Sequence, residues 1–492
     1  MSRLTRVITF FLAICLLGSA LFAGRPTKSS VLVIDHVTVI DVSGGPARAD
    51  QTVVVSGDII SVVARSGSIE APKSAQLVDG RGKFLIPGLW DMHTHIAGIS
   101  AKPSWAKQVL IPLLVANGIT GIRDMGGDLD ALEQWRREIS SGVLIGPRIV
   151  AAGPMLLPPR RSTALDPADP AELRVGTPEE ARKAVGQLQR RGADFVKIIE
   201  VSRDAYFAIS EESKKDGISF AGHIPSDVTA VEASNASQKS VEHIIYSSLA
   251  FDCSAQEVEL RQKASEAAKK RDRQTMAAIT DEANRTFSPE KAAALWLTFK
   301  KNGTWVTPTL FSIYANAHHF DDSPTDLQLA FLPSALRKEW APSQNPTQDD
   351  RDTAAWWQRQ FENDRKLTGE MHRAGVRLLA GSDSLDRYVF VGASLHQELQ
   401  MLVTAGLTPL DALQTATRNS AEFLGRKDLG AIAAGKRADM VLLEADPTLE
   451  IANTQKISAV ILAGNFLSRA SLDQMLLKAR AAAAAAPTDA RN

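Results

Sequence analysis

The chain has 492 residues, which is enough for one large domain and a smaller one with a substantial buried core. Its 56 lysines and arginines balance 56 aspartates and glutamates, so the net charge is zero and the composition argues against a partner such as nucleic acid or an anionic surface. Hydrophobic residues make up 44% and aromatic residues 6%, as in an ordinary globular protein.

The first residues, 1–23, have the pattern of a secretory signal peptide. Arg3 and Arg6 precede an apolar run from Val7 to Ala23 that ends in small residues. This pattern predicts a secreted or periplasmic protein with no stable membrane span after removal of the signal. The run is near the lower length of a membrane span, so retention as an anchor stays open. Without this segment Cys253 is the only cysteine, and no internal disulfide is expected.

Short β-rich segments stand at both ends of the chain. Residues 30–85 contain "VLVIDHVTVIDV" and "QTVVVSGDIISVVA", in which Val, Ile and Thr alternate with other residues between Gly and Asp turns. Residues 428–470 contain similar stretches at Ala438–Pro447 and Ile457–Phe466. The two ends are predicted to build one small β-sandwich domain together, with a C-terminal helix or tail over residues 471–492.

Residues 86–427 alternate between strands and amphipathic helices. The predicted strands are Gly88–His95, Ile119–Met125, Arg148–Pro154, Phe195–Glu200, Ile218–His223, Ser240–Ile244, Thr304–Leu310 and Val376–Asp383. Eight strands with helical crossovers predict an α/β fold, a (β/α)₈ TIM barrel, and a doubly wound open sheet is the alternative. A charged, helical insertion around residues 251–361 is too long for a crossover, and such insertions commonly cover active sites.

One helix start in this region is marked by its sequence. Thr177, Pro178 and Glu180 form the pattern of a capping box with proline in the first turn.

Residue types that bind metals recur at the carboxyl ends of the predicted strands, which meet at one rim of a barrel. His93 and His95 are two positions apart, so a strand places both side chains on one face. The other residues at strand ends are Lys197, His223, His243 and Asp383. Each alone fits an ordinary core, snorkelling or capping residue, but that reading does not explain their common register. Imidazoles and a carboxylate suit a divalent cation, which can lower the pKa of a bound water to about 7.

The motifs around these residues resemble those of the metal-dependent amidohydrolase superfamily, in particular its imidazolonepropionase/prolidase-like branch with a binuclear metal centre. They are "PGLWDMHTH", "GITGIRDMGG", "GADFVKI", "AGHIP", "SVEHIIY", "TPTL" and "LLAGSDS". The resemblance continues through "SLHQELQMLVTAGLTPLDALQTATRNSAEFLG" and "GAIAAGKRADMVLLEADP", and it spans about Val31 to Phe466.

The resemblance implies two divalent metal ions, with zinc as the expected metal. The implied ligands are His93, His95 and Asp383 for one ion, His223 and His243 for the second, and Lys197 as a bridging carbamate.

The resemblance also implies catalytic and substrate-binding roles. Asp383 would take a proton from a metal-bridging hydroxide and pass it to the leaving amine. Tyr246 would bind or polarise the substrate. Ile244 and Ser384 stand where glycine and alanine are usual, so the shape of the pocket and the substrate stay open.

The expected function is that of a secreted metal-dependent hydrolase of carbon–nitrogen bonds, with a small molecule or a dipeptide as substrate. A dipeptidase and an N-acyl-amino-acid hydrolase both fit. A Schiff-base lyase with Lys197 as nucleophile is one alternative. A non-catalytic, metal-bearing binding protein is another, and Asp383 counts against it because binding alone needs no proton carrier. The sequence leaves homo-oligomerisation open.

Overall fold

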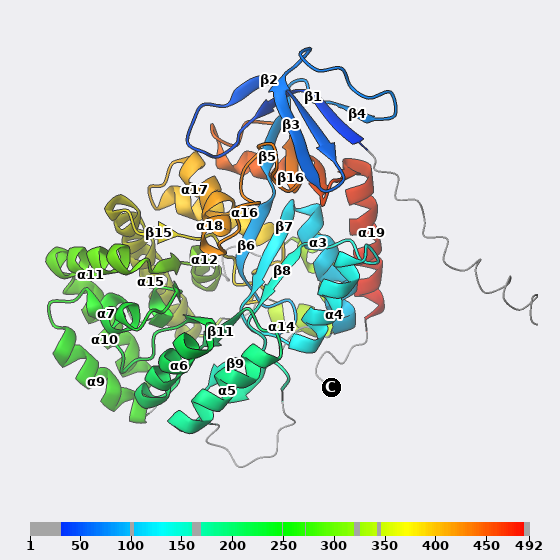
Figure 1. The fold of residues 1–492 in the computed structure, drawn as a ribbon. Coiled ribbons are helices and arrows are strands. Elements are labelled where there is room, and N and C mark those ends of the chain that lie inside the picture. Colours follow the sequence, from blue (N-terminus) through cyan, green and yellow to red (C-terminus); the bar gives the residue numbers. More distant parts are fainter. Residues whose placement is uncertain are drawn as a thin grey trace, which may run out of the picture.

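The computed structural model describes residues 31–98, 103–159, 169–247, 249–270, 272–318, 325–341 and 346–486. A β-rich domain lies at one end of a barrel that is surrounded by helices (Figure 1). The predicted signal peptide, residues 1–23, and residues 487–492 of the predicted tail lie outside the described residues. Within the described ranges, no helix is long and apolar enough to cross a membrane.

Eight parallel strands form the barrel, and all eight lie within the predicted segments. They are β6 (Leu89–Thr94), β7 (Ile119–Asp124), β8 (Arg148–Ala151), β11 (Phe195–Ile198), β12 (Ser219–Gly222), β13 (Ser240–Glu242), β14 (Trp305–Thr307) and β15 (Arg377–Leu378). One arc runs from β6 to β8 and the other from β11 to β15. Two short strands, β9 (Met155–Leu157) and β10 (Glu172–Arg174), extend the second arc beyond β11.

Backbone hydrogen bonds close the two arcs into a barrel. The Asp194 amide donates to the Ala151 carbonyl at 2.9 Å, which joins β11 to β8. The Asp383 amide donates to the His93 carbonyl at 2.8 Å, which joins the segment after β15 to β6. The predicted TIM barrel is therefore confirmed, and the open-sheet alternative is wrong.

The two ends of the chain build one β domain, as predicted. Its strands are β1 (Val31–Val39), β2 (Arg48–Ser56), β3 (Ile59–Arg65), β4 (Gln76–Asp79), β5 (Phe84–Pro87), β16 (Met440–Leu443), β17 (Ile457–Leu462) and β18 (Asn465–Ser468). They form one mixed sheet in the order β18-β17-β16-β5-β1-β2-β3, with β4 paired to β1. The antiparallel pairing of β16 with β5 joins the two ends. Ile34, Val53 and Met440 are fully buried in its apolar core.

Helices cover the outside of the barrel and fill the region of the predicted insertion (Figure 1). Those used below are α5 (Pro178–Arg190), α12 (Leu310–His318), α15 (Gln348–Ala374) and α19 (Arg469–Ala485). Thr177 caps α5 through its hydroxyl, as expected, but the carboxylate of Glu180 accepts from the Gly176 amide instead of completing a capping box. The domain boundaries stay predictions.

The longest of these helices, α15, runs from the predicted insertion back toward the barrel. It starts at a capping box formed by Thr347 and Asp350, and it ends where Gly375 takes a left-handed conformation with φ of 79°. It packs on α12, which follows β14 directly. The insertion therefore places helical side chains beside the carboxyl ends of the barrel strands.

Candidate metal centre

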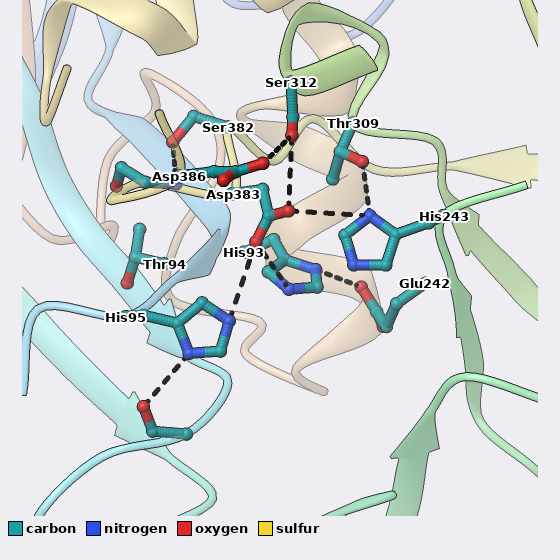
Figure 2. A network of polar contacts seen from close by, with 12 residues as sticks. His93, Thr94, His95, Glu242, His243, Thr309, Ser312, Ser382, Asp383 and Asp386 are labelled. Atoms are coloured by element: carbon teal, nitrogen blue, oxygen red, sulfur yellow. Dashed lines mark hydrogen bonds and ion pairs between the residues drawn. The ribbon is translucent and has the colours of Figure 1, made fainter. Parts of the chain in front are cut away.

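His93 and His95 stand at the carboxyl end of β6 with their orientation fixed by hydrogen bonds (Figure 2). His93 is fully buried, and its Nδ1 lies 2.9 Å from Oε2 of Glu242. The Nδ1 of His95 lies 3.0 Å from the carbonyl oxygen of Gly126. A carboxylate and a carbonyl only accept, so each Nδ1 carries the proton and each Nε2 keeps a free lone pair. This arrangement of a hydrogen-bonded Nδ1 and a free Nε2 is typical of metal-binding histidines.

Asp383 faces both of these lone pairs (Figure 2). Its Oδ1 lies 3.4 Å from Nε2 of His93 and 3.6 Å from Nε2 of His95. One ligand atom from each of the three residues lies within 4.8 Å of the others, a spacing that fits a single metal ion held by all three. Burial, and then the charge of Asp386, raises the pKa of Asp383 to about 7.

His243, which follows β13, is also held by its Nδ1. Nδ1 lies 2.6 Å from Oγ1 of Thr309, and that hydroxyl lies 2.8 Å from the carbonyl oxygen of Pro308. The hydroxyl donates to the carbonyl and therefore accepts from Nδ1, which leaves Nε2 of His243 as the free ligand atom. The His243 ring lies 4.6 Å from the His93 ring and 5.0 Å from the His223 ring, centroid to centroid.

Glycine at position 222 explains how His223 reaches this site. Gly222 has φ of 136°, and a Cβ there would lie 2.0 Å from the carbonyl oxygen of Ile198. A side chain is therefore excluded, because it would push β12 away from β11. The same Ile198 carbonyl accepts the His223 amide at 3.0 Å, which fixes His223 beside the strand that carries Lys197.

Lys197 on β11 is fully buried, and its Nζ has no hydrogen-bond partner among the described residues. Burial lowers the pKa of Lys197 to about 8, although the carboxylates of Glu242 and Asp383 oppose the shift. Burial also lowers the pKa of each of the four histidines, His93, His95, His223 and His243. The charge of Lys197 lowers these pKa values further, which indicates that the lysine and the imidazoles belong to one site. A buried amine with a lowered pKa is partly neutral at neutral pH, as reaction with carbon dioxide requires.

Tyr246 lies at the edge of the site in the short helix Ile245–Ser247. Its ring stacks on His223 with a centroid distance of 5.6 Å and an interplanar angle of 11°. Trp357 of α15 lies edge to face with it at 6.2 Å, so the predicted insertion reaches the rim here. Tyr246 is 40% exposed, which makes it accessible to a substrate.

An ion pair beneath the histidines is a feature that the sequence did not predict. Arg123 on β7 donates through Nη2 to both oxygens of Glu242 at 2.8 and 2.9 Å, and both side chains are fully buried. Loss of one partner of such a pair costs about 3–5 kcal/mol, because the other charge stays buried. The pair fixes Glu242 and hence His93. Both residues stood in the quoted motifs, but nothing in their spacing paired them.

The family of the chain follows from comparison with known proteins. Residues 84–467 match the amidohydrolase family. The chain belongs to the amidohydrolase family. This confirms the predicted superfamily, and the predicted class of enzyme, a hydrolase of carbon–nitrogen bonds, agrees with it.

Solved structures share the fold of this family member. A Xaa-Pro dipeptidase with bound methionine aligns at 21% identity and a TM-score of 0.66, over 89% of this chain and 100% of that chain. A putative prolidase from Bifidobacterium longum aligns at 24% identity and a TM-score of 0.65, over 92% of this chain and 99% of that chain. At these identities the likeness shows a shared fold, and the prolidase-like branch stays a prediction.

Two curated relatives differ in how much of the chain they match. The ochratoxinase of Aspergillus niger is 24% identical over 490 residues, which cover 88% of this chain and 85% of the relative. An adenine deaminase from Ligilactobacillus salivarius is 35% identical over 103 residues, 20% of this chain. The chain spans only 18% of the length of that deaminase.

The hydroxyl of Thr309 is expected to support metal binding through His243. Thr309→Val removes the hydroxyl at nearly constant shape, while Thr309→Ser keeps it as a matched control. The Val variant should bind zinc about 10–100-fold more weakly, because His243 loses the partner that fixes its tautomer. Competition with a fluorescent chelator measures this affinity. Equal affinities for the two variants would show that the hydroxyl does not orient His243.

Proposed function

We propose that this chain is a metal-dependent hydrolase that cleaves an amide or peptide bond in a small molecule or dipeptide, with two divalent ions at the rim of the barrel. Zinc is the expected metal. His93, His95 and Asp383 would hold one ion, His223 and His243 the second, and Lys197 would bridge them as a carbamate.

The observation that carries this proposal is a pair of unsatisfied buried atoms. Nε2 of His93 and Nζ of Lys197 have no hydrogen-bond partner in the part of the chain that the structure describes. Buried polar atoms are nearly always hydrogen-bonded, so two such atoms in one site support a missing ligand. A metal ion would accept the His93 lone pair. An ammonium would repel the ions, whereas a carbamate on Lys197 would offer two anionic oxygens to them.

The residues of the site suit amide hydrolysis. When bound, the metal pair would supply a water that is activated near neutral pH and would polarise the scissile carbonyl. Asp383 would accept the proton of that water and deliver it to the leaving amine. Glu242 and Thr309 would hold His93 and His243 in orientation, and Tyr246 would contact the substrate from the rim.

The surroundings of Lys197 argue against the Schiff-base lyase. The charge of Lys197 acts on all four histidines, and a lysine nucleophile needs no such cluster of metal-binding side chains. The non-catalytic alternative is less well supported than hydrolysis, because Asp383 is 14% exposed and lies beside the Ser312 hydroxyl, where a proton carrier is of use.

We also propose that the protein is exported, on the basis of the signal pattern in residues 1–23. Cell fractionation followed by N-terminal sequencing should find a shortened chain outside the cytoplasm, and an intact Met1 on cytoplasmic protein would contradict export.

Replacing Lys197 tests the bridge. Lys197→Ala should lower kcat by at least about 10–100-fold, the range seen when even an indirect metal partner is lost. A small carboxylate such as propionate should partly restore the rate, because it can take the place of the carbamate. Lys215→Ala, which removes an exposed lysine, is the control. An unchanged kcat in Lys197→Ala would refute the bridge.

Replacing Asp383 separates proton transfer from metal binding. Asp383→Asn keeps the size and one oxygen ligand but carries no proton, so kcat for an amide should fall at least about 100-fold. An activated ester should suffer less, because its leaving group needs little protonation. Metal content should drop less than in His93→Ala. Equal losses for amide and ester, in proportion to lost metal, would mean that Asp383 is only a ligand.

A further inference from the structure

A second carboxylate, that of Asp386, lies next to Asp383 (Figure 2). Oγ of Ser312 lies 3.5 Å from Oδ2 of Asp383 and 3.1 Å from Oδ2 of Asp386, so one hydroxyl spans the two carboxylates. Asp386 is half-buried. After burial, the charges of Asp386 and Asp383 are the main causes that raise the pKa of Tyr246, so both carboxylates lie near this tyrosine.

Among the described residues, the Asp386 carboxylate has neutral hydrogen-bond partners and no cationic one. Its oxygens accept from the Ser312 hydroxyl, from Nδ2 of Asn316 at 3.2 Å and from the Arg387 amide at 2.8 Å, all neutral donors. No nitrogen of a described lysine, arginine or histidine lies within the 4.0 Å of an ion pair. The described residues thus give the Asp386 carboxylate no charged partner, and a substrate cation would supply one.

We propose that Asp386 binds the free α-ammonium group of an N-terminal residue, so that the substrates are dipeptides or aminoacyl amides and not N-acyl amino acids. This inference rests on the proposed hydrolase function and names its substrate class. A charge-assisted hydrogen bond of this kind is roughly twice as strong as a neutral one.

The covalent geometry of a dipeptide brings its ammonium group near this position. The α-nitrogen and the scissile carbonyl carbon are joined through one Cα, so they lie about 2.5 Å apart. Asp383 must lie beside the scissile bond to pass a proton to the leaving amine. The ammonium group therefore comes close to Asp383. The Ser312 hydroxyl links Asp383 to Asp386. The two metal ions would repel an ammonium, and a carboxylate here offsets that repulsion.

The simpler alternative is that Asp386 only ties its loop to α12. Ser312 and Asn316 both belong to α12, and Asp386 accepts from each of them. A tie of this kind would affect all substrates equally, whereas binding of an ammonium would affect only substrates that carry one. Substrate pairs that differ in this single group distinguish the two roles.

The test uses a mixture of Xaa-Leu dipeptides and the same mixture N-acetylated, on zinc-loaded full-length protein, with leucine release as the readout. Wild-type protein should cleave the free dipeptides with at least about tenfold higher kcat/KM. Asp386→Asn should remove about tenfold of this preference, mainly through KM, and change cleavage of the acetylated mixture by less than about twofold. Asp386→Glu should keep the preference. Asp473→Asn, which removes an exposed carboxylate of α19, is the matched control.

Each outcome decides the proposal. Equal cleavage of the two mixtures by wild-type protein, or equal loss for both in Asp386→Asn at unchanged metal content, would overturn the role of Asp386 and leave the hydrolase function intact. Cleavage of neither mixture would overturn the ammonium site together with dipeptide hydrolysis, and would leave only a small-molecule amide as substrate of the proposed hydrolase. The wild-type comparison needs no variant, so it stays decisive even if Asp386→Asn does not fold.

Discussion

The hydrogen bond from the Asp383 amide to the His93 carbonyl closes the barrel and at the same time sets three proposed ligands side by side. His93 belongs to the first strand and Asp383 follows the last, so neither is near the other along the chain. Closure of eight parallel strands brings their carboxyl ends to one rim, and side chains at those ends must converge there. The proposed metal centre is thus a consequence of barrel closure, and any change that opens the seam between β6 and the segment after β15 should separate its proposed ligands.

Burying several polar groups at one rim costs free energy, and hydrogen bonds to further polar groups in the barrel interior offset this cost. Glu242 pairs with Arg123 in a site where both are fully buried, and it orients His93 with its second oxygen. Ser240 donates to the same carboxylate, and the Nε of Arg123 donates to the Met92 carbonyl at 2.6 Å. Networks in which every member is satisfied are rigid, and rigid support suits a site that must hold ions in fixed geometry.

Much of this arrangement was predictable from the sequence. Strands such as Phe195–Ile198 are short apolar runs between helical patterns. Lys197 stands out because it is a charged residue inside such a run, and His223 because it directly follows one. Pairing of the two chain ends followed from their shared alternation of β-branched residues. Such signals are local, because one segment carries both the element and the residue at its end.

The side chains that orient the proposed ligands were not predictable in the same way. Arg123 and Glu242 lie on different strands, and Thr309 supports His243 from the start of α12. These pairings depend on which strands become neighbours across the barrel. The residue pattern of a single segment does not indicate its neighbours. Asp386 was missed for a related reason. Its significance lies in the missing cationic partner and in the Ser312 bridge to Asp383, both of which appear only once the loop is folded.

The central claim is a centre built for two ions, and the number of bound ions tests it most directly. The six proposed ligands, with Lys197 as a bridging carbamate, would exceed the four that a tetrahedral zinc ion takes. Purified protein reconstituted with zinc and bicarbonate, freed of unbound metal and analysed by mass spectrometry of the elements, should contain about two zinc ions per chain. One ion or fewer per chain under these conditions would contradict the account.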